Sequence, residues 1–278
     1  MKIEPGQTVL LTGASGGLGT VMTRAFAECG FRQALVAFPG IELEDLASAV
    51  RDRGTEVLTF ASDLQDPEQR RHVVREVQHR FGKIDILVNN AGVEYNSFYH
   101  ELSEARINEV LNVNLTAAMI LSRLVLPGML ERKQGHIISI SSLAGKSGPA
   151  FQEPYAASKA ALVAFTMSLR ATYRELGVSA SVVVPGFVEA GIYSRLKQTA
   201  GRPAPRLLGA CSPERVAQAV LRALRRDVSE IIVNRYPIRP VLMLTALSPS
   251  LGAWLSSKFG TNEFFRAAVL AQKRESGS

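Results

Sequence analysis

The sequence predicts an α/β fold, a doubly wound parallel sheet with helices on both faces. Short apolar segments rich in β-branched residues alternate with longer helical segments from about residue 7 to residue 234. This alternation requires crossover connections, which join parallel strands through helices that cover both faces of the sheet. The 278 residues are 46% hydrophobic and 21% charged, a composition typical of a soluble globular protein.

Each predicted strand is a short apolar run that ends at turn residues. The predicted strands cover residues 7–12, 34–38, 57–61, 84–88, 136–141, 178–184 and 230–234. Between them the pattern predicts helices at residues 18–29, 42–53, 67–80, 103–131, 154–177 and 213–226. Gly30 and Gly177 suit helix ends, whereas Pro67 and Pro154 suit first helical turns. The segment 187–211 is rich in Gly and Pro, and we expect an irregular functional lid there.

The composition excludes several classes of protein. Cys29 and Cys211 fit neither a disulfide framework nor a metal site, so we expect no metal and a cytoplasmic, reducing environment. The first residues lack the apolar core of a signal peptide, and no run reaches the roughly 20 apolar residues of a membrane span. The net charge of +7 favours anionic partners: a phosphorylated cofactor, an acidic substrate or an anionic surface. Nucleic acid is disfavoured because no basic run carries interleaved aromatic residues.

A glycine-rich turn, Gly13-Ala-Ser-Gly-Gly-Leu-Gly19, connects the first strand to the first helix. Such a turn brings backbone N–H groups against a diphosphate at the positive end of the helix. The alternative is that the glycines serve only the tight geometry of the turn. Because a strand precedes the turn and a helix follows it, we interpret it as a dinucleotide-binding site.

Tyr155 and Lys159 stand four residues apart on a predicted helix, so both project from one face. We expect the lysine cation to stabilise the phenolate and to lower the pKa of the phenol from about 10. A phenol of this kind suits proton donation to a carbonyl, or proton removal from an alcohol, near neutral pH. The same spacing occurs by chance on many solvated helix faces, so the pair needs support from other motifs.

Such support comes from a resemblance to the short-chain dehydrogenase/reductase family, in its compact single-domain form, over about residues 8–234. Thr12-Gly13-x-x-x-Gly17-x-Gly19 resembles the cofactor turn of the family, and Asn89-Asn-Ala-Gly92 resembles its signature after the fourth strand. The residues that match the four catalytic positions are Asn114, Ser142, Tyr155 and Lys159. The resemblance implies a Rossmann-type fold and hydride transfer between nicotinamide and a carbonyl or secondary alcohol.

The resemblance also implies a role for each matched residue. Tyr155 would exchange the proton of the substrate oxygen, Lys159 would lower its pKa and bind the nicotinamide ribose, and Ser142 would hold the substrate oxygen. Asn114 would anchor a water that leads protons from Lys159 to solvent. Ser141 is the alternative to Ser142, although it better suits the end of the strand. Cofactor contacts are implied for Gly13, Ser15, Gly17, Leu18, Gly19, Phe38, Asp63, Leu64, Asn90, Ala91, Gly92, Tyr155, Lys159, Pro185, Gly186 and Val188.

Two positions depart from the family pattern. Phe38 and Pro39 stand where an acid would bind the ribose of NAD, or a nearby arginine the 2′-phosphate of NADP. With no carboxylate there to repel a phosphate, and with Ser15 able to donate to one, the sequence favours NADP slightly over NAD. Ala190 stands where the family often has a threonine that binds the carboxamide, so either Glu189 or backbone groups compensate, or the cofactor binds more loosely.

The expected function is therefore an NAD(P)-dependent oxidoreductase that acts on a small, apolar carbonyl or alcohol substrate. One alternative is a catalytically silent member that senses redox state or serves as a scaffold, and another is a sugar-nucleotide epimerase or dehydratase. The presence of all four catalytic residues favours the enzyme over the silent member. The residues expected to line the substrate pocket are Phe151, Gln152, Phe187, Val188, Ile192, Tyr193 and Leu196.

The helix that contains Tyr155 also predicts a homo-oligomer. Its apolar residues point to more than one side, which indicates burial on two faces. We expect one face to meet the sheet and the other to meet a partner subunit beside the helix at 103–131, as in relatives. The expected assembly is a homodimer or a homotetramer.

Residues 1–235 are expected to form one dinucleotide-binding and catalytic domain, and residues 236–278 an apolar helical extension. Pro237, Pro240 and Pro249 break the apolar part of this extension, which excludes a membrane span and suits two short helices. Trp254, the only tryptophan, is followed by basic residues. Two interpretations stay open: a cover over the substrate cleft or a subunit interface, and an interfacial segment that meets an anionic lipid surface.

Overall fold

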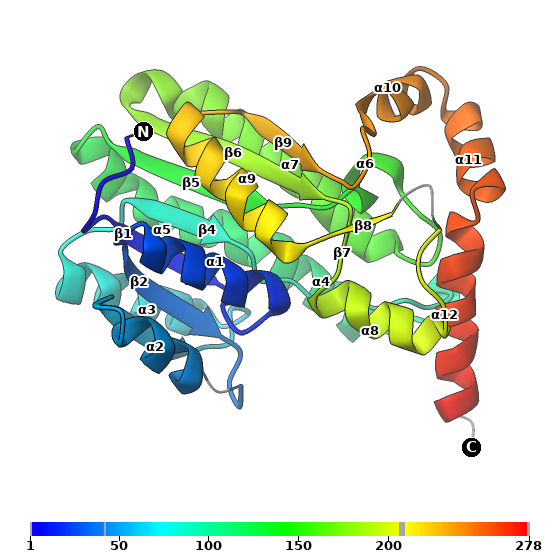
Figure 1. Cartoon of the computed structure of the whole chain (residues 1–278), viewed down its shortest axis with the longest axis horizontal. Helices are drawn as coiled ribbons and strands as arrows, with labels where there is room; N and C mark the ends of the chain where they lie inside the picture. Colours follow the sequence, from blue (N-terminus) through cyan, green and yellow to red (C-terminus); the bar gives the residue numbers. More distant parts are fainter. Residues whose placement is uncertain (1, 42, 206–208, 277–278) are drawn as a thin grey trace.

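A seven-stranded parallel sheet forms the centre of the protein (Figure 1). The computed structural model describes residues 2–41, 43–205 and 209–276. The strands are β1 (Thr8–Thr12), β2 (Arg32–Ala37), β3 (Val57–Ala61), β4 (Ile86–Asn89), β5 (Gly135–Ile140), β6 (Val178–Pro185) and β9 (Glu230–Val233). Their order is β3-β2-β1-β4-β5-β6-β9, and all neighbours are parallel. The predicted doubly wound sheet is confirmed.

Helices cover both faces of the sheet because each carries one apolar stripe. On one face lie α1 (Gly17–Glu28), α2 (Glu44–Arg51) and α9 (Pro213–Arg226), of which α1 and α9 are in front in Figure 1. On the other face lie α3 (Pro67–Phe81), α5 (Ala117–Glu131) and α7 (Glu153–Tyr173). Val73 and Val77 of α3 illustrate the stripe, since they stand four residues apart and both are fully buried. The helix predicted from Glu42 begins at Glu44, and Glu42 itself lies outside the described residues.

The long helix predicted at 103–131 is interrupted by one π-helical turn, Asn112–Thr116, between α4 (Glu104–Leu111) and α5. By length and composition this helix could cross a membrane, with a mean hydropathy of 1.5 in its most apolar 18-residue window. However, 44% of that window is buried inside the protein. Leu121, Val125 and Met129 belong to the core, so this is a core helix of the α/β fold.

The prediction of an irregular segment at 187–211 is wrong over most of its length. β7 (Phe187–Val188) pairs with β8 (Ala210–Cys211), and α8 (Gly191–Ala200) lies between them. This helix forms because Tyr193 and Leu196 share an apolar face that is buried in an aromatic cluster. Residues 206–208 lie outside the described residues.

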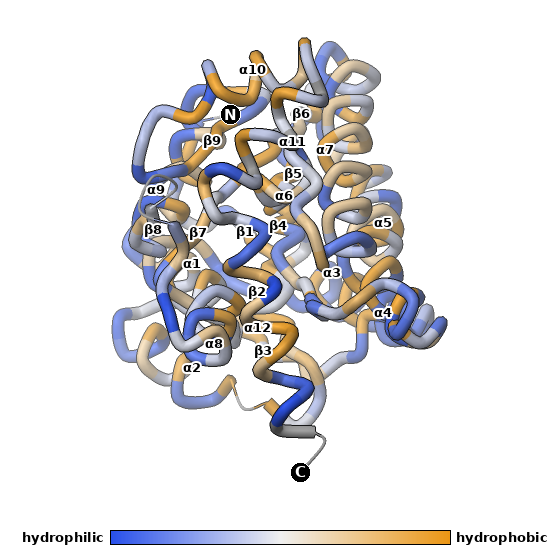
Figure 2. The backbone as a smooth tube through the Cα atoms, turned by 90° about the vertical axis from the view of Figure 1, so that its right-hand side faces the viewer, coloured by the Kyte–Doolittle hydropathy of each residue, from blue (hydrophilic) through white to orange (hydrophobic). Residues whose placement is uncertain are grey.

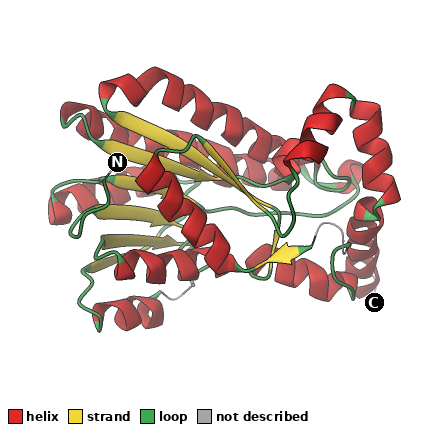
Figure 3. Cartoon of the chain, turned by 45° about the horizontal axis from the view of Figure 1, so that its top comes forward, coloured by secondary structure: helices red, strands yellow, loops and turns green. Residues whose placement is uncertain are grey.

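Three helices follow β9: α10 (Arg239–Leu247), α11 (Pro249–Lys258) and α12 (Thr261–Ser276). The two short helices predicted for the apolar part correspond to α10 and α11, and α12 is a third helix within the predicted helical extension. Phe264 and Phe265 of α12 are buried against Phe187 and Tyr193, with ring centroids 5.7–6.4 Å apart. Figures 1 and 3 show the three helices at one end of the molecule, beyond the carboxyl ends of the strands.

Candidate active site

One cavity of about 700 Å³ lies at the carboxyl ends of the strands, next to β1, where the chain order of the sheet reverses. One part of the cavity is lined by the glycine turn after β1 and by Asn90, Ala91 and Gly92 after β4. The other part is an apolar chamber between α8 and the C-terminal helices; the tail residues that line it include Val241, Leu242, Leu255, Phe259 and Phe265. The catalytic candidates of α7 stand where the two parts meet.

With the exception of Gly19, every residue predicted to bind the cofactor lines this cavity. These residues are Gly13, Ser15, Gly17, Leu18, Phe38, Asp63, Leu64, Asn90, Ala91, Gly92, Tyr155, Lys159, Pro185, Gly186 and Val188. Gly19 instead lies where α1 touches the turn, since a Cβ there would be 2.2 Å from the carbonyl oxygen of Gly13. Its role in this structure is the close packing of the helix on the turn.

The two cofactor loops brace one another through hydrogen bonds. Asn90 Nδ2 donates to the carbonyl oxygens of Thr12 and Gly13, at 3.0 Å each. Thr12 Oγ1 accepts from the backbone N–H groups of Asn90 and Ala91, also at 3.0 Å each. These contacts fix the turn after β1 against the segment after β4, so the wall between them is rigid.

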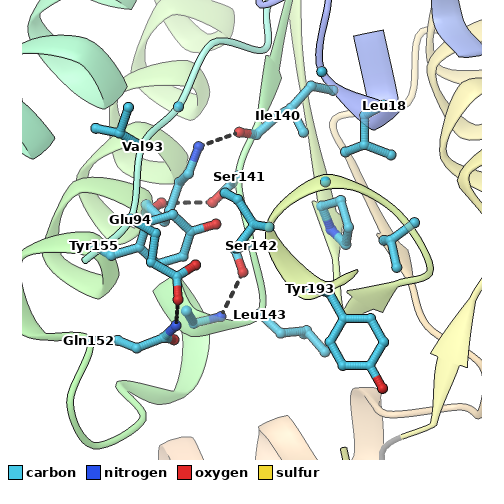
Figure 4. A pocket seen from close by; sticks show the side chains of 18 of the residues that line it. Leu18, Val93, Glu94, Ile140, Ser141, Ser142, Leu143, Gln152, Tyr155 and Tyr193 are labelled. Carbon is cyan, nitrogen blue, oxygen red and sulfur yellow. Dashed lines mark hydrogen bonds between the residues drawn. The ribbon is translucent and has the colours of Figure 1, made fainter. Parts of the chain in front are cut away.

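Tyr155 and Lys159 are both buried on the first turns of α7, and Figure 4 shows Tyr155 beside Ser142. Lys159 Nζ lies 5.6 Å from the centroid of the Tyr155 ring and donates to the carbonyl oxygen of Ile140 at 3.0 Å. Pro154 in the first turn removes an N–H that would have no helical partner. The helix thus presents a phenol and an ammonium group to the junction of the two compartments.

Ser142 and Ser141 have different environments. Ser142 Oγ accepts from the backbone N–H of Ala144 at 3.1 Å, and the hydroxyl hydrogen-bonds with the Tyr155 phenol. Ser141 Oγ donates to the carbonyl oxygen of Lys159 at 2.7 Å, which joins the end of β5 to α7. Ser141 therefore holds the helix, while Ser142 faces the phenol.

The expectation that the pKa of Tyr155 lies below that of a free phenol is wrong for this structure. Burial raises the pKa of the Tyr155 phenol well above 10, and the carboxylate of Glu94 acts in the same direction. Burial also lowers the pKa of Lys159 from 10.5 to about 8, so the ammonium group is itself poorly solvated. Desolvation is the largest contribution to the pKa shift of both groups. The phenol is therefore held in its protonated form.

Asn114 is buried behind the cavity wall in the π-helical turn. Its Oδ1 accepts from the backbone N–H of Val93 at 2.8 Å, and its Nδ2 donates to the Val93 carbonyl oxygen at 3.0 Å and to Ser158 Oγ at 3.1 Å. These bonds fix the segment after Gly92. The water-anchoring role of Asn114 stays a prediction.

The predicted substrate residues line the cavity except for Phe151, and they are Gln152, Phe187, Val188, Ile192, Tyr193 and Leu196. Phe151 instead packs edge-on against Phe98, with ring centroids 5.3 Å apart. Ala190 lines the cavity, whereas Glu189 forms an ion pair with Lys197 at 3.3 Å and is not part of the wall.

Sequence reasoning missed Glu94, which lines the chamber beside Tyr155 and accepts a hydrogen bond from Gln152 (Figure 4). Its only sequence signal is its place two residues after Gly92. Burial raises the pKa of Glu94, while hydrogen bonds from Asn96 and Gln152 act in the opposite direction.

Comparison with known proteins shows which family has the same motifs. The family model described as short chain dehydrogenase matches residues 7–201. The chain is 38% identical over 270 residues to the ketoacyl reductase HetN of Nostoc sp., which covers 95% of this chain and 93% of that protein. It is 33% identical over 241 residues to the 3-oxoacyl-[acyl-carrier-protein] reductase FabG of Thermotoga maritima, which covers 84% of this chain and 96% of that protein.

Among solved structures, a metagenomic short-chain oxidoreductase in complex with NADP superposes with a TM-score of 0.71 at 31% sequence identity, covering 84% of this chain and 98% of that chain. The sheet order, the glycine turn and the Tyr155–Lys159 pair agree with this relationship. The protein belongs to the short-chain dehydrogenase/reductase family and is an NAD(P)-dependent oxidoreductase.

Proposed function

We propose that this enzyme reduces the carbonyl group of a lipophilic substrate with NADPH or NADH, with Ser142, Tyr155, Lys159 and Asn114 as its catalytic residues. The observation that carries the proposal is the continuity of the cavity. The glycine turn, the hydroxyl groups of Ser142 and Tyr155 and the apolar chamber all line one space of about 700 Å³. A carbonyl group at the junction would face both the phenol and the cofactor compartment.

The cofactor compartment fits a dinucleotide diphosphate. The N-terminus of α1 has no side-chain cap, so its first N–H groups are available to an anion beside the cavity. Gly13 has a φ of 66°, and a Cβ there would lie 2.9 Å from the Cα of Ala91. Gly13, Ser15 and Gly17 would hold the diphosphate, and Asp63 and Leu64 would meet the adenine.

When bound, the cofactor supplies the hydride for reduction or accepts it in the reverse direction. Tyr155 donates its phenol proton to the substrate oxygen, and Ser142 holds that oxygen by a hydrogen bond. Because burial raises the pKa of Tyr155, the phenol is protonated and ready for reduction at neutral pH. Lys159, beside the phenol, stabilises the negative charge that remains when the proton has left.

The chamber supports a lipophilic substrate. Leu196, Val241, Leu242, Leu255 and Phe265 surround the space beyond Tyr155, and such a wall favours an acyl or other hydrocarbon chain. The names of two relatives, ketoacyl reductase HetN and 3-oxoacyl-[acyl-carrier-protein] reductase FabG, refer to acyl substrates, which agrees with this chemistry.

Chain-length dependence tests the substrate. In a series of 3-oxoacyl thioesters, kcat/KM with NADPH should rise about fourfold per added methylene until the chamber is filled, since each buried methylene contributes about 0.8 kcal/mol. A value of kcat/KM that is flat or falls with chain length would contradict the lipophilic chamber. Tyr155→Phe should lose at least about 100-fold in kcat and keep its NADPH affinity. An unchanged kcat would remove Tyr155 from the mechanism.

We also infer that this enzyme, expected in the cytoplasm, contacts an anionic membrane surface through α10 and α11. Met243, Leu247 and Trp254 are 67%, 82% and 56% exposed on these helices, and orange segments mark the apolar stretch of α10 in Figure 2. Residues 236–262 contain Arg239 and Lys258 but no acidic residue. An exposed apolar surface with only positive charges suits the interface of an anionic bilayer. The other side of the same helices lines the chamber, so a lipophilic substrate would enter beside the membrane.

Trp254 reports on this contact because it is the only tryptophan in the chain. Vesicles of phosphatidylcholine with phosphatidylglycerol should shift its emission to shorter wavelength at low salt, and vesicles of phosphatidylcholine alone should shift it less. Leu247→Ser should weaken co-sedimentation, whereas Leu176→Ser, an exposed leucine outside these helices, should not. If the full-length protein stays in the supernatant when anionic vesicles are sedimented, the membrane contact is contradicted and the tail serves only as a wall of the chamber.

The proposed assembly is a homodimer or homotetramer through α5 and α7. Met119 and Met167 are exposed on these helices, although the helices pack against the core on their other sides. A subunit that covered both methionines would bury this apolar surface.

A further inference from the structure

Two carboxylates, Glu94 and Glu109, line the cavity, and they differ in how their charge is compensated. Glu109 forms an ion pair with Arg106 at 3.0 Å and accepts a hydrogen bond from Tyr95 at 2.9 Å. For Glu94, no basic side chain among residues 2–41, 43–205 and 209–276 lies within ion-pair distance. Its partners are the neutral amides of Gln152 and Asn96. Glu94 therefore presents a carboxylate to the chamber without a salt-bridged counterion.

The position of Glu94 is fixed from both sides. The preceding residue, Val93, is held by Asn114 through its backbone N–H and carbonyl groups. Gln152, only 3% exposed, donates from Nε2 to Glu94 and lies 3.3 Å from Asn96 Oδ1. Phe151 precedes Gln152 with a φ of 66°, a conformation that is unfavourable for an aromatic residue and is held here by packing on Phe98. The strained residue therefore lies directly before Gln152, the residue that precedes α7 and hydrogen-bonds to Glu94.

The carboxyl group lies within the electrostatic range of the reacting groups. The charged and titratable groups that face it are Tyr155 and Lys159 of α7 and Arg195 of α8. A substrate carbonyl placed between Ser142 and Tyr155 would have its neighbouring atoms next to Glu94, since all three side chains point into the same space in Figure 4. In a poorly solvated chamber, a second negative charge beside a carboxylate is repelled strongly, whereas an N–H or O–H group is a suitable partner.

We propose that Glu94, oriented by Gln152, is a specificity-determining residue that selects carbonyl substrates without a negative charge near the reacting carbon. It accepts a hydrogen bond from a hydroxyl or amide N–H close to the carbonyl, and it disfavours substrates with a carboxylate or phosphate there. Esters, thioesters and amides of oxo acids fit this selection, whereas the free oxo acids do not. The inference rests on the proposed reduction of a carbonyl substrate in the same chamber.

A matched substrate pair tests the selection. We would measure kcat/KM with NADPH for a 4-oxo fatty acid and for its methyl ester over a series of increasingly alkaline buffers, because burial raises the pKa of Glu94 and the selection requires its ionised form. The wild-type enzyme should prefer the ester. In Glu94→Gln, which keeps the shape of the side chain, the ester-to-acid ratio should fall roughly tenfold or more. Glu109→Gln is the control, because the charge of Glu109 is already paired, and its ratio should match that of the wild type.

Glu94→Leu provides a second variant if the amide disturbs folding, and its ratio should fall in the same way. NADPH affinity and thermal midpoint, measured for each variant, separate a change of selectivity from a loss of structure. A ratio that is unchanged in both Glu94 variants, or that falls equally in Glu109→Gln, overturns the assignment. If the wild-type enzyme reduces neither substrate nor any 3-oxoacyl thioester, the proposed function fails instead.

Discussion

The contact between α6 (Ala144–Ser147) and α7 offers a direct test of how the catalytic helix is positioned. Gly145 faces the backbone of α7 at the catalytic lysine. A methyl group at Gly145 would lie 2.6 Å from the backbone N of Ala160 and the carbonyl carbon of Lys159, and 2.8 Å from the carbonyl oxygen of Lys159. That oxygen also accepts the hydrogen bond from Ser141. Gly145→Ala therefore pushes against backbone atoms that cannot rotate away.

The size of the effect follows from these distances. Ordinary carbon contacts begin near 3.5 Å, so the two helices must separate by about 1 Å. Overpacking of this kind destabilises a protein by about 1–3 kcal/mol, of which about 0.5–1 kcal/mol is offset because alanine favours helix over glycine. A displacement of about 1 Å at Lys159 and Tyr155 can lower kcat by about 100-fold.

Urea unfolding and steady-state turnover with NADPH measure the two effects. Gly128→Ala in α5 is the control, since its Cβ would first meet the mobile end of Arg132, at 3.2 Å, rather than backbone. We expect Gly145→Ala to lose about 1–2 kcal/mol and most of its turnover, and Gly128→Ala to keep or gain stability. Wild-type turnover in Gly145→Ala, with stability equal to that of Gly128→Ala, would refute the view that this contact positions the catalytic turn.

Three further predictions concern the cofactor, pH and assembly. Steady-state kinetics should show that the wild type uses NADPH at least as efficiently as NADH. Phe38→Asp should shift the preference toward NADH, because the carboxylate would repel a 2′-phosphate. A strong wild-type preference for NADH would be contrary evidence. Burial lowers the pKa of Lys159 from 10.5 to about 8. Between these two pH values the unfolded chain binds more protons than the folded protein, so the stability of the folded protein rises with pH. Chemical denaturation across this range should show the rise in the wild type but not in Lys159→Met, and equal slopes would argue against the buried cation. Sedimentation should give at least a dimer at micromolar concentration, and Met167→Glu should dissociate it if α7 is the interface; a wild-type monomer would exclude the assembly.

The parts of the structure that could be predicted from sequence are those with local signals. The strand, glycine turn and helix around Gly13 are adjacent in the chain, and Tyr155 and Lys159 share one helical face by their spacing alone. The alternation of strands and helices then required the parallel sheet. For α8, a local signal was present in Tyr193 and Leu196, but the flanking Gly and Pro residues favoured a loop. For α12, the helical spacing of Phe264, Phe265 and Ala268 was a local signal, but the prediction for the tail described only the two short helices before it.

The electrostatics of the site could not be predicted, because they depend on residues far apart in the chain. Glu94 and Gln152 are 58 positions apart and meet only in the folded protein. The raised pKa of Tyr155 likewise comes from burial under several elements and from Glu94, whereas the sequence displays only the nearby Lys159.

The aromatic contacts between α8 and α12 also bear on how the enzyme matures during synthesis. The glycine turn, β4 and α7 all precede β9 in the chain, whereas the helices that close the chamber follow it. Since domains fold from the N-terminal side as they leave the ribosome, the dinucleotide compartment can form before Phe264 and Phe265 have been translated. Until they arrive, Phe187 and Tyr193 have each other as partners but lack the two phenylalanine rings of α12 that pack on them. A nascent chain at this stage would bind the nucleotide and offer this unfinished aromatic surface to a chaperone.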